Sequence, residues 1–140
     1  MHEITDKLLV GNVYDAEKPP AGVGAVLFVA EEFSIQPPAG IVFEKISLKE
    51  YGEAEVVSLD RAVSWVERQL RDNRVMVCCR AGMGRSVSVV MAYLCCVDGM
   101  TYPEVWKLAM TRRPGAVPLP NLRSAIEQVT RLRQDRTHNV

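Results

Sequence analysis

The chain has 140 residues, 48% of them hydrophobic and 24% charged, with a formal net charge of zero. These values predict one globular domain spanning residues 1–140, and the scattered basic residues argue against nucleic acid as a partner. No apolar run approaches the ~20 residues of a membrane span, and the N-terminus lacks the pattern of a signal peptide. The four cysteines lie in adjacent pairs, a poor disulfide framework, so we expect reduced thiols and a cytoplasmic protein.

The predicted elements alternate between strands and helices along the chain. In chain order, the apolar patterns predict strands at 7–10, 24–30 and 41–48, a helix over 53–71, a strand at 74–79, and helices over 86–98, 101–111 and 121–134. This alternation predicts an α/β domain with a mostly parallel sheet flanked by helices. We expect a flexible tail from about Gln134. The acidic residues are concentrated in the first half and the basic residues in the second, so either the two halves form differently charged faces of a solvated surface or the second half handles an anion.

The stretch VMVCCRAGMGRS, residues 75–86, carries the most specific pattern in the chain. A buried strand ends at Cys79, a short glycine-bearing loop follows, and a helix begins near Arg85. Backbone N–H groups of such a loop, together with a helix N-terminus, form a site for an anion. The expected phosphate-binding segment is therefore Arg80, Ala81, Gly82, Met83 and Gly84, with the forked guanidinium of Arg85 holding two further oxygens.

The position of Cys79 at the base of this loop indicates nucleophilic catalysis. A helix N-terminus and a nearby cation lower the pKa of a thiol, so we expect Cys79 to react as the thiolate. A thiolate beneath a bound phosphoryl group is placed for in-line attack, which gives a phosphocysteine intermediate. The hydroxyl of Ser86 is placed to ease the departure of the sulfur in the second step. Cys95 and Cys96 lie among apolar residues in the middle of a helix, and we interpret them as structural.

These residues resemble the His-Cys-x2-Gly-x2-Arg-Ser signature of dual-specificity, cysteine-dependent (Cys-x5-Arg) protein tyrosine phosphatases. The likeness extends to KLLVGNVYDA (7–16) and to the segment 91–121, and it covers most of residues 4–133. It implies a four- or five-stranded, mostly parallel sheet flanked by helices, with the phosphate loop between a strand end and the central helix. It also implies a phosphoric monoester hydrolase. We expect a monomer without a cofactor, and without a metal, since His2 and His138 offer no ligand cluster.

The sequence departs from the family pattern at two positions. The family's histidine before the nucleophile is Cys78 here, which creates an adjacent dithiol. Cys78 is either a redox partner of Cys79 or a small apolar residue facing the core. The family's general-acid aspartate lies in the pattern aromatic-x2-Ile-x3-Asp, which places Glu50 at the acid position. Glu53 is the alternative, Glu55 lies close by, and the absence of a dedicated acid is the third interpretation.

The substrate is less well determined by the sequence. The resemblance favours proteins that carry phosphotyrosine, phosphoserine or phosphothreonine. The Ala-Gly in the loop is similar to loops of phosphatases that act on phosphoinositides or phosphoglucans. Arg80 is either a cation at the rim that suits such a polyanion or a loop side chain that only faces solvent. A catalytically weak phosphate-binding pseudophosphatase is a further alternative, because the family's histidine and aspartate are both replaced. Arg112 and Arg113 are placed either to form a second anion subsite or to cap their helix.

Overall fold

A computed structural model describes residues 1–138 and contains one five-stranded sheet. The strands are β1 (His2–Glu3), β2 (Leu8–Gly11), β3 (Val23–Ala30), β4 (Val42–Leu48) and β5 (Arg74–Cys78). Their order in the sheet is β1-β2-β5-β3-β4; β1 is antiparallel to β2, and all other neighbouring pairs are parallel. Strand β5 therefore lies at the centre, and the residues that follow it emerge at the edge where the parallel strands end.

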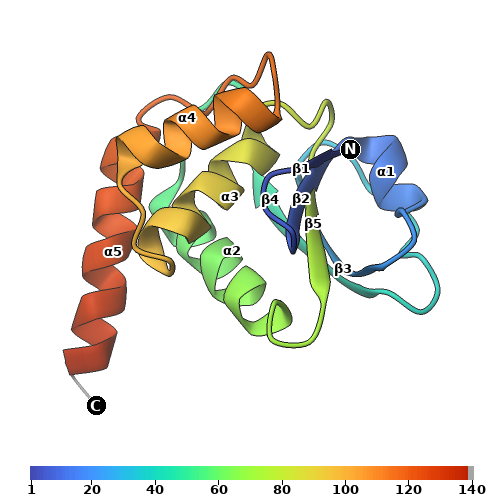
Figure 1. The fold of residues 1–140 in the computed structure, drawn as a ribbon, viewed down its shortest axis with the longest axis horizontal. Coiled ribbons are helices and arrows are strands. Elements are labelled where there is room, and N and C mark those ends of the chain that lie inside the picture. Colours follow the sequence, from blue (N-terminus) through green and yellow to red (C-terminus); the bar gives the residue numbers. More distant parts are fainter. Residues whose placement is uncertain (139–140) are drawn as a thin grey trace.

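The helices form layers on the two faces of this sheet (Figure 1). They are α1 (Val13–Glu17), α2 (Val56–Gln69), α3 (Arg85–Cys96), α4 (Tyr102–Arg112) and α5 (Leu122–His138). In Figure 1, α2 to α5 lie on one side of the sheet, and the short α1 lies on the other. Residues 85–94 of α3 are all buried, because this helix packs between the sheet and the other helices. An apolar helix of this kind requires burial on every face.

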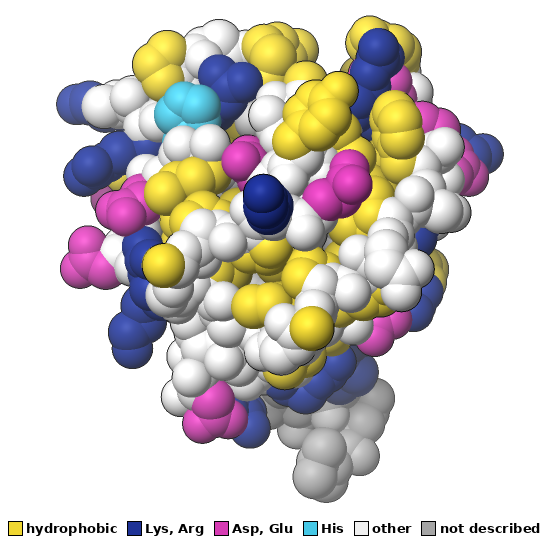
Figure 2. Space-filling model, turned by 90° about the vertical axis from the view of Figure 1, so that its right-hand side faces the viewer, with side chains coloured by type: hydrophobic (Ala, Val, Ile, Leu, Met, Phe, Trp, Pro, Cys, Tyr) yellow, Lys and Arg dark blue, Asp and Glu magenta, His cyan; other side chains and the backbone are white. Residues whose placement is uncertain are grey.

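The short helix α1 lies on the face of the sheet opposite to the other helices. Figure 2 views this face and shows apolar side chains gathered in a shallow hollow, with charged side chains around it. The helix α1 begins at a capping box, in which the side chain of Asn12 accepts from the N–H of Asp15 and the Asp15 carboxylate accepts from the N–H of Asn12. Such reciprocal bonds satisfy two N–H groups that a helix start leaves open. The chain direction after β2 is thereby fixed beside the end of β5.

The architecture confirms the predicted α/β fold, with differences at three elements. The two-residue strand β1 and the five-residue helix α1 are too short for a periodic pattern and were not predicted. Helix α5 continues to His138 instead of ending near Gln134, and Arg136 there forms two hydrogen bonds of 2.8 Å with Asp60 of α2. The predicted helix over 101–111 is confirmed as α4, which begins at a capping box formed by Thr101 and Glu104. No helix within residues 1–138 is both long and apolar enough to cross a membrane.

Candidate active site

The segment between β5 and α3 forms a loop whose carbonyl groups all point away from its centre. Each carbonyl from Arg80 to Gly84 accepts a hydrogen bond from outside this stretch. In order, the donors are the N–H of Val13 (3.2 Å), Nη2 of Arg113 (3.4 Å), Nε of Arg113 (3.0 Å), the N–H of Val117 (2.8 Å) and the N–H of Ser88 (2.9 Å). Because the carbonyl and the N–H of a peptide point in opposite directions, this arrangement turns N–H groups inward.

The inward N–H groups are available to a ligand. Within residues 1–138, no protein acceptor receives a hydrogen bond from the N–H groups of residues 80–85. The N–H groups at the start of α3 are among them, and a helix N-terminus adds partial positive charge. The segment 80–85, which we call the phosphate loop, therefore has the form of an anion cradle.

Two glycines allow the loop to close. Gly82 has φ +69°, in the left-handed region, and a Cβ at this position would lie 2.8 Å from the carbonyl oxygen of Gly11. A Cβ at Gly84 would lie 3.1 Å from the carbonyl oxygen of Val117. The first glycine is needed both for its backbone conformation and for a close approach, and the second for a close approach alone.

Cys79 lies at the base of the loop, directly after the central strand, and only 2% of its surface is exposed. Its Sγ lies 3.3 Å from Oγ of Ser86, within hydrogen-bonding distance. The neighbouring Cys78 is the last residue of β5 and is fully buried. Burial, followed by the charges of Asp15 and Cys79, raises the pKa of the Cys78 thiol well above its usual value. Cys78 is therefore a neutral thiol near pH 7, unlike the histidine that the family carries.

The guanidinium of Arg85 is 3% exposed and is held by an acidic residue that the sequence did not single out. Glu32, two residues beyond β3, accepts two hydrogen bonds from Arg85, of 2.5 Å and 2.8 Å. Nη1 of Arg85 also donates to the carbonyl of Leu48 at 3.1 Å. Forked pairing of this kind fixes the orientation of a guanidinium as well as its position. Glu32 follows a parallel strand at the edge that carries the phosphate loop, which is the one sequence signal that points to it.

The pairing changes the titration of both partners. The hydrogen bonds from Arg85 lower the pKa of Glu32 to about 2, although burial works in the opposite direction. Burial of Arg85 acts to lower its pKa, but the Glu32 pairing and the charges of Cys79 and Glu50 together raise it. Arg85 therefore stays charged and Glu32 stays ionised throughout the physiological range.

Of the three glutamates considered as general acids, the structure brings Glu50 to the site. Its Oε2 lies 4.0 Å from Nη2 of Arg85 and 3.9 Å from Nη1 of Arg80, and its side chain is 32% exposed. Glu53 and Glu55 are exposed and do not line the cavity, and Glu55 lies at the N-cap of α2. Next to Glu50, Tyr51 adopts φ +62°, which is uncommon for a residue with a side chain.

The site is a cavity of about 370 Å³ with a polar base and an apolar wall. Cys79, Arg85 and Glu50 supply the ionisable groups at the base. The wall and rim are formed by Tyr51, Ala81, Met83, Val117, Pro118, Leu119 and Pro120. Backbone hydrogen bonds anchor this wall at both ends, from the N–H of Val117 to Met83 and from the N–H of Ala54 to Pro120. The wall therefore connects the phosphate loop to the segment that carries Glu50.

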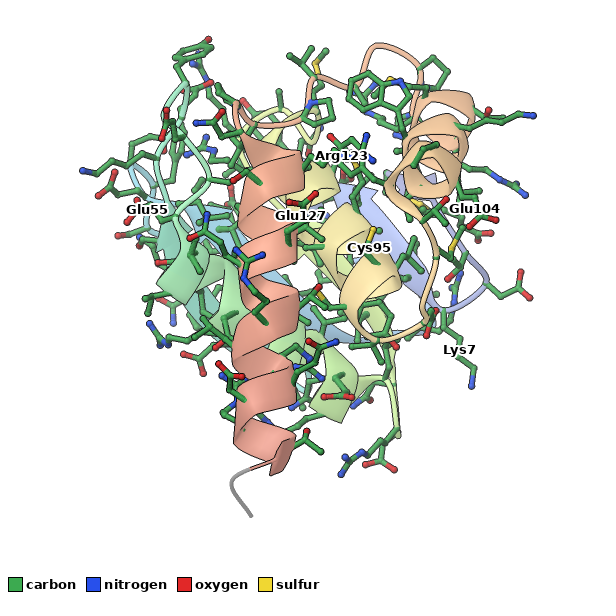
Figure 3. The ribbon with its side chains drawn as sticks, turned by 90° about the vertical axis from the view of Figure 1, so that its left-hand side faces the viewer. Lys7, Glu55, Cys95, Glu104, Arg123 and Glu127 are labelled. Atoms are coloured by element: carbon green, nitrogen blue, oxygen red, sulfur yellow. The ribbon has the colours of Figure 1, made fainter. Side chains whose placement is uncertain are left out.

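The second pair of cysteines lies at the far end of α3. Figure 3 shows Cys95 near Arg123 and Glu127 of α5, which point towards it. Burial raises the pKa of Cys95 to about 11, and burial also raises that of Cys96. The Sγ of Cys96 lies 3.5 Å from Oγ1 of Thr130. Both positions agree with the structural interpretation. Within residues 1–138, no three His, Cys, Asp or Glu side chains are grouped to hold a metal ion.

Comparison with known proteins identifies the family. The chain matches the model of the dual specificity phosphatase catalytic domain over residues 22–132. It is 29% identical over 134 residues to dual specificity protein phosphatase 1B of Arabidopsis thaliana, covering 91% of this chain and 80% of that protein. It is 28% identical over 142 residues to the phosphatidylglycerophosphate phosphatase PTPMT2 of the same plant, covering 93% and 62%.

The solved structures agree on the fold. The crystal structure of human DUSP28 matches with a TM-score of 0.83 and 20% identity, covering 97% of this chain and 99% of that one. At this identity the likeness establishes the fold alone. With the match to the family model, which spans most of the chain, the assignment is direct: the chain belongs to the dual specificity phosphatase family and is a cysteine-dependent phosphatase.

Proposed function

We propose that this phosphatase uses Cys79 as nucleophile, Arg85 and the phosphate loop as the phosphoryl-binding group, and Glu50 as general acid and base. One observation carries the proposal. The sulfur of Cys79, the guanidinium of Arg85 and the carboxylate of Glu50 line a single cavity, beneath loop N–H groups that have no acceptor in the described part of the chain. The nucleophile, the anion binder and the proton donor thus converge where a phosphate ester has to sit.

In the first step, the substrate phosphate occupies the cradle with two oxygens on Arg85. The thiolate of Cys79 attacks phosphorus, so a bond between sulfur and phosphorus forms while the bond to the ester oxygen breaks. Glu50 transfers its proton to the departing oxygen, which leaves as a neutral alcohol or phenol. The charge on the transferring phosphoryl group is stabilised by the fixed N–H groups and by Arg85.

In the second step, a water molecule attacks the phosphorus of the phosphocysteine. Glu50, now a carboxylate, accepts a proton from that water, and the bond between phosphorus and sulfur breaks. Ser86, whose Oγ lies 3.3 Å from the sulfur, donates a hydrogen bond to the departing thiolate. The products are inorganic phosphate and the free enzyme, with Glu50 protonated again.

We propose phosphorylated protein side chains as the substrates, with phosphotyrosine the best of them. The wall formed by Tyr51, Val117 and Pro118 offers apolar surface beside the phosphate position, which suits an aromatic ring. Arg80 is the one exposed cation among the loop residues, and Glu50 lies 3.9 Å from it. A second phosphate group beside Arg80 would meet the negative charges of Glu50, which lines the cavity, and of Glu32, whose pKa the charge of Arg80 also lowers. These charges disfavour a polyphosphorylated headgroup, although the similarity to the PTPMT2 phosphatase keeps a phospholipid monoester as the second candidate.

The oligomeric state and the cellular compartment are also proposals. We propose that the protein works as a monomer, because one chain alone lines the cavity that holds the residues of the mechanism. We propose a reducing, cytoplasmic compartment, because Cys79 must stay reduced to act as the nucleophile and all four cysteines are free. The oxidised alternative, a bond between Cys78 and Cys79 that protects the nucleophile, predicts that dithiothreitol restores activity after treatment with hydrogen peroxide.

Hydrolysis of p-nitrophenyl phosphate by the wild type and by Cys79→Ser tests the mechanism. We expect the variant to lose activity by at least about a thousandfold. Equal rates for the two proteins would make the chain a pseudophosphatase. The substrate is then tested by binding to Cys79→Ser, which separates affinity from the leaving group. Matched peptides with phosphotyrosine or phosphothreonine, and phosphatidylglycerophosphate vesicles, form the panel. Tighter binding of the vesicles than of either peptide would favour the second candidate.

A further inference from the structure

Arg113 ends α4 and reaches back to the phosphate loop. It is half-buried, and its backbone N–H completes the helix by donating to the carbonyl of Ala109. Its side chain has neither of the two roles that the sequence analysis left open. It neither faces the cavity as a second anion subsite nor caps the carbonyls of its own helix. It crosses to the phosphate loop, where it reaches carbonyls that lie 32 and 31 residues earlier in the chain.

The guanidinium of Arg113 donates only to backbone carbonyls. Nε donates to Gly82 at 3.0 Å, Nη2 to Ala81 at 3.4 Å and Nη1 to Pro114 at 2.6 Å. Among the described residues, no carboxylate forms a salt bridge with it. The neighbouring Arg112 is exposed and makes none of these contacts. One side chain therefore supplies the donors for two successive carbonyls of the phosphate loop.

These two carbonyls belong to the part of the loop that most needs support. The other outward carbonyls, of Arg80, Met83 and Gly84, are held by backbone N–H groups. The peptides on either side of Gly82, which carry the carbonyls of Ala81 and Gly82, have no such backbone partner, and glycine allows a peptide to rotate at low cost. If either peptide rotated, a carbonyl oxygen would enter the cradle and repel a bound anion. A charged donor on the carbonyl also polarises the peptide, which strengthens the N–H on its inner side.

We propose that Arg113 is a positioning residue that holds the phosphate loop in its anion-binding form. The inference rests on the proposed function of the loop, but it concerns phosphate binding and does not depend on turnover. Arg113 acts through the backbone of Ala81 and Gly82 and does not touch the reacting atoms. Its contribution is to keep the inner N–H groups aligned before the substrate arrives, which is the preorganisation that oxyanion-type stabilisation requires.

The test is the dissociation constant of inorganic phosphate, measured by calorimetry on folded protein, for the wild type, Arg113→Gln, Arg113→Lys and Arg112→Gln. We expect Arg113→Gln to weaken phosphate binding by about tenfold, the value of one lost charged hydrogen bond. Arg113→Lys should recover part of this loss, because an ammonium can reach one carbonyl but not both. Arg112→Gln should bind phosphate as the wild type does, although it removes the same charge from the adjacent position.

Three outcomes contradict the proposal. The first is unchanged phosphate affinity in Arg113→Gln at temperatures well below its unfolding midpoint, which would leave only a structural role. The second is equal weakening in Arg112→Gln, which would indicate a general charge effect. The third is a loss confined to doubly phosphorylated peptides, which would indicate a second anion subsite. Phosphate binding that depends on Arg113 in a protein that hydrolyses no ester would support the inference and contradict the proposed function.

Discussion

Adjacent cysteines lie near both ends of helix α3, in opposite settings. At its N-terminal end, Cys79 lies beneath N–H groups and beside Arg85 and Ser86. At its C-terminal end, Cys95 and Cys96 lie between helices, where burial raises the pKa of both thiols. A helix N-terminus favours an anion and a C-terminus disfavours one. We infer that position decides the chemistry of a cysteine in this chain, because composition and adjacency are the same at both ends.

The largest expected effect is the difference in labelling rate when the cysteines near the two ends of α3 react with the same reagent. With a pKa raised to about 11, Cys95 is ionised to about one part in ten thousand at pH 7. We therefore expect iodoacetate to modify Cys79 at least about a thousand times faster than Cys95, since the thiolate is the reacting form. Mass spectrometry of labelled peptides measures both rates in the same sample. Inorganic phosphate should protect Cys79 alone, and equal labelling of both cysteines would contradict the comparison.

A second test concerns the acid that distinguishes the catalytic end. Glu50→Gln should lower kcat by about a hundredfold on phenyl phosphate, because a general acid contributes on that scale. On p-nitrophenyl phosphate the loss should be much smaller, since nitrophenolate departs without a proton. Glu53→Gln is the matched control and should behave as the wild type on both esters. If Glu53→Gln shows the larger loss on phenyl phosphate, the acid has been assigned to the wrong residue.

The sequence predicted the part of this site that is contiguous and missed the part that is not. Cys79, the glycines, Arg85 and Ser86 lie within one short stretch, so their spacing alone indicates a strand, a loop and a helix start. Glu32 lies 53 residues from its partner Arg85, and Arg113 lies 31 residues from Gly82. Both positions look like ordinary surface charges in the sequence. Their roles arise from tertiary contacts that no local period encodes.

The same distinction between local patterns and long-range contacts applies to the prediction of the fold. Long segments with regularly spaced or continuous apolar residues predicted β3, β4, β5 and the four long helices. The parallel sheet was predicted from the alternation of these strands and helices. Helix α1 was missed because five residues carry no measurable period, although Asn12 and Asp15 hold its capping box. The omission matters for function, since the N–H of Val13 in this helix holds the carbonyl of Arg80. Short elements fixed by capping and tertiary contacts are those that apolar periodicity does not detect.

A third prediction concerns Glu32, which orients Arg85 at the catalytic end. Glu32→Gln keeps the size of the side chain but removes the charge, so the forked pair loses its geometry. We expect kcat/KM for p-nitrophenyl phosphate to fall by about tenfold, mostly through KM, because Arg85 binds the substrate phosphate. Glu31→Gln, at the adjacent exposed position, is the control and should show no change. An equal loss in both variants would mean that general charge near the site, rather than the pair, is responsible.

The smallest expected effect is on the free energy of unfolding at acidic pH, and it follows from the pair of Glu32 and Arg85. In the folded protein the pKa of Glu32 is lowered to about 2, from the value of 4.5 that a glutamate has without its partner. Its contribution is therefore complete above about pH 4.5 and is lost as the pH falls towards 2. Because the Glu32 side chain is 39% exposed, solvent screening reduces this contribution to about 1 kcal/mol. Urea unfolding of the wild type and Glu32→Gln should differ by this amount at pH 6 and converge near pH 2. A constant difference across that range would show that the lost stability comes from packing and not from the ionised pair, which would separate the structural contribution of Glu32 from its effect on Arg85.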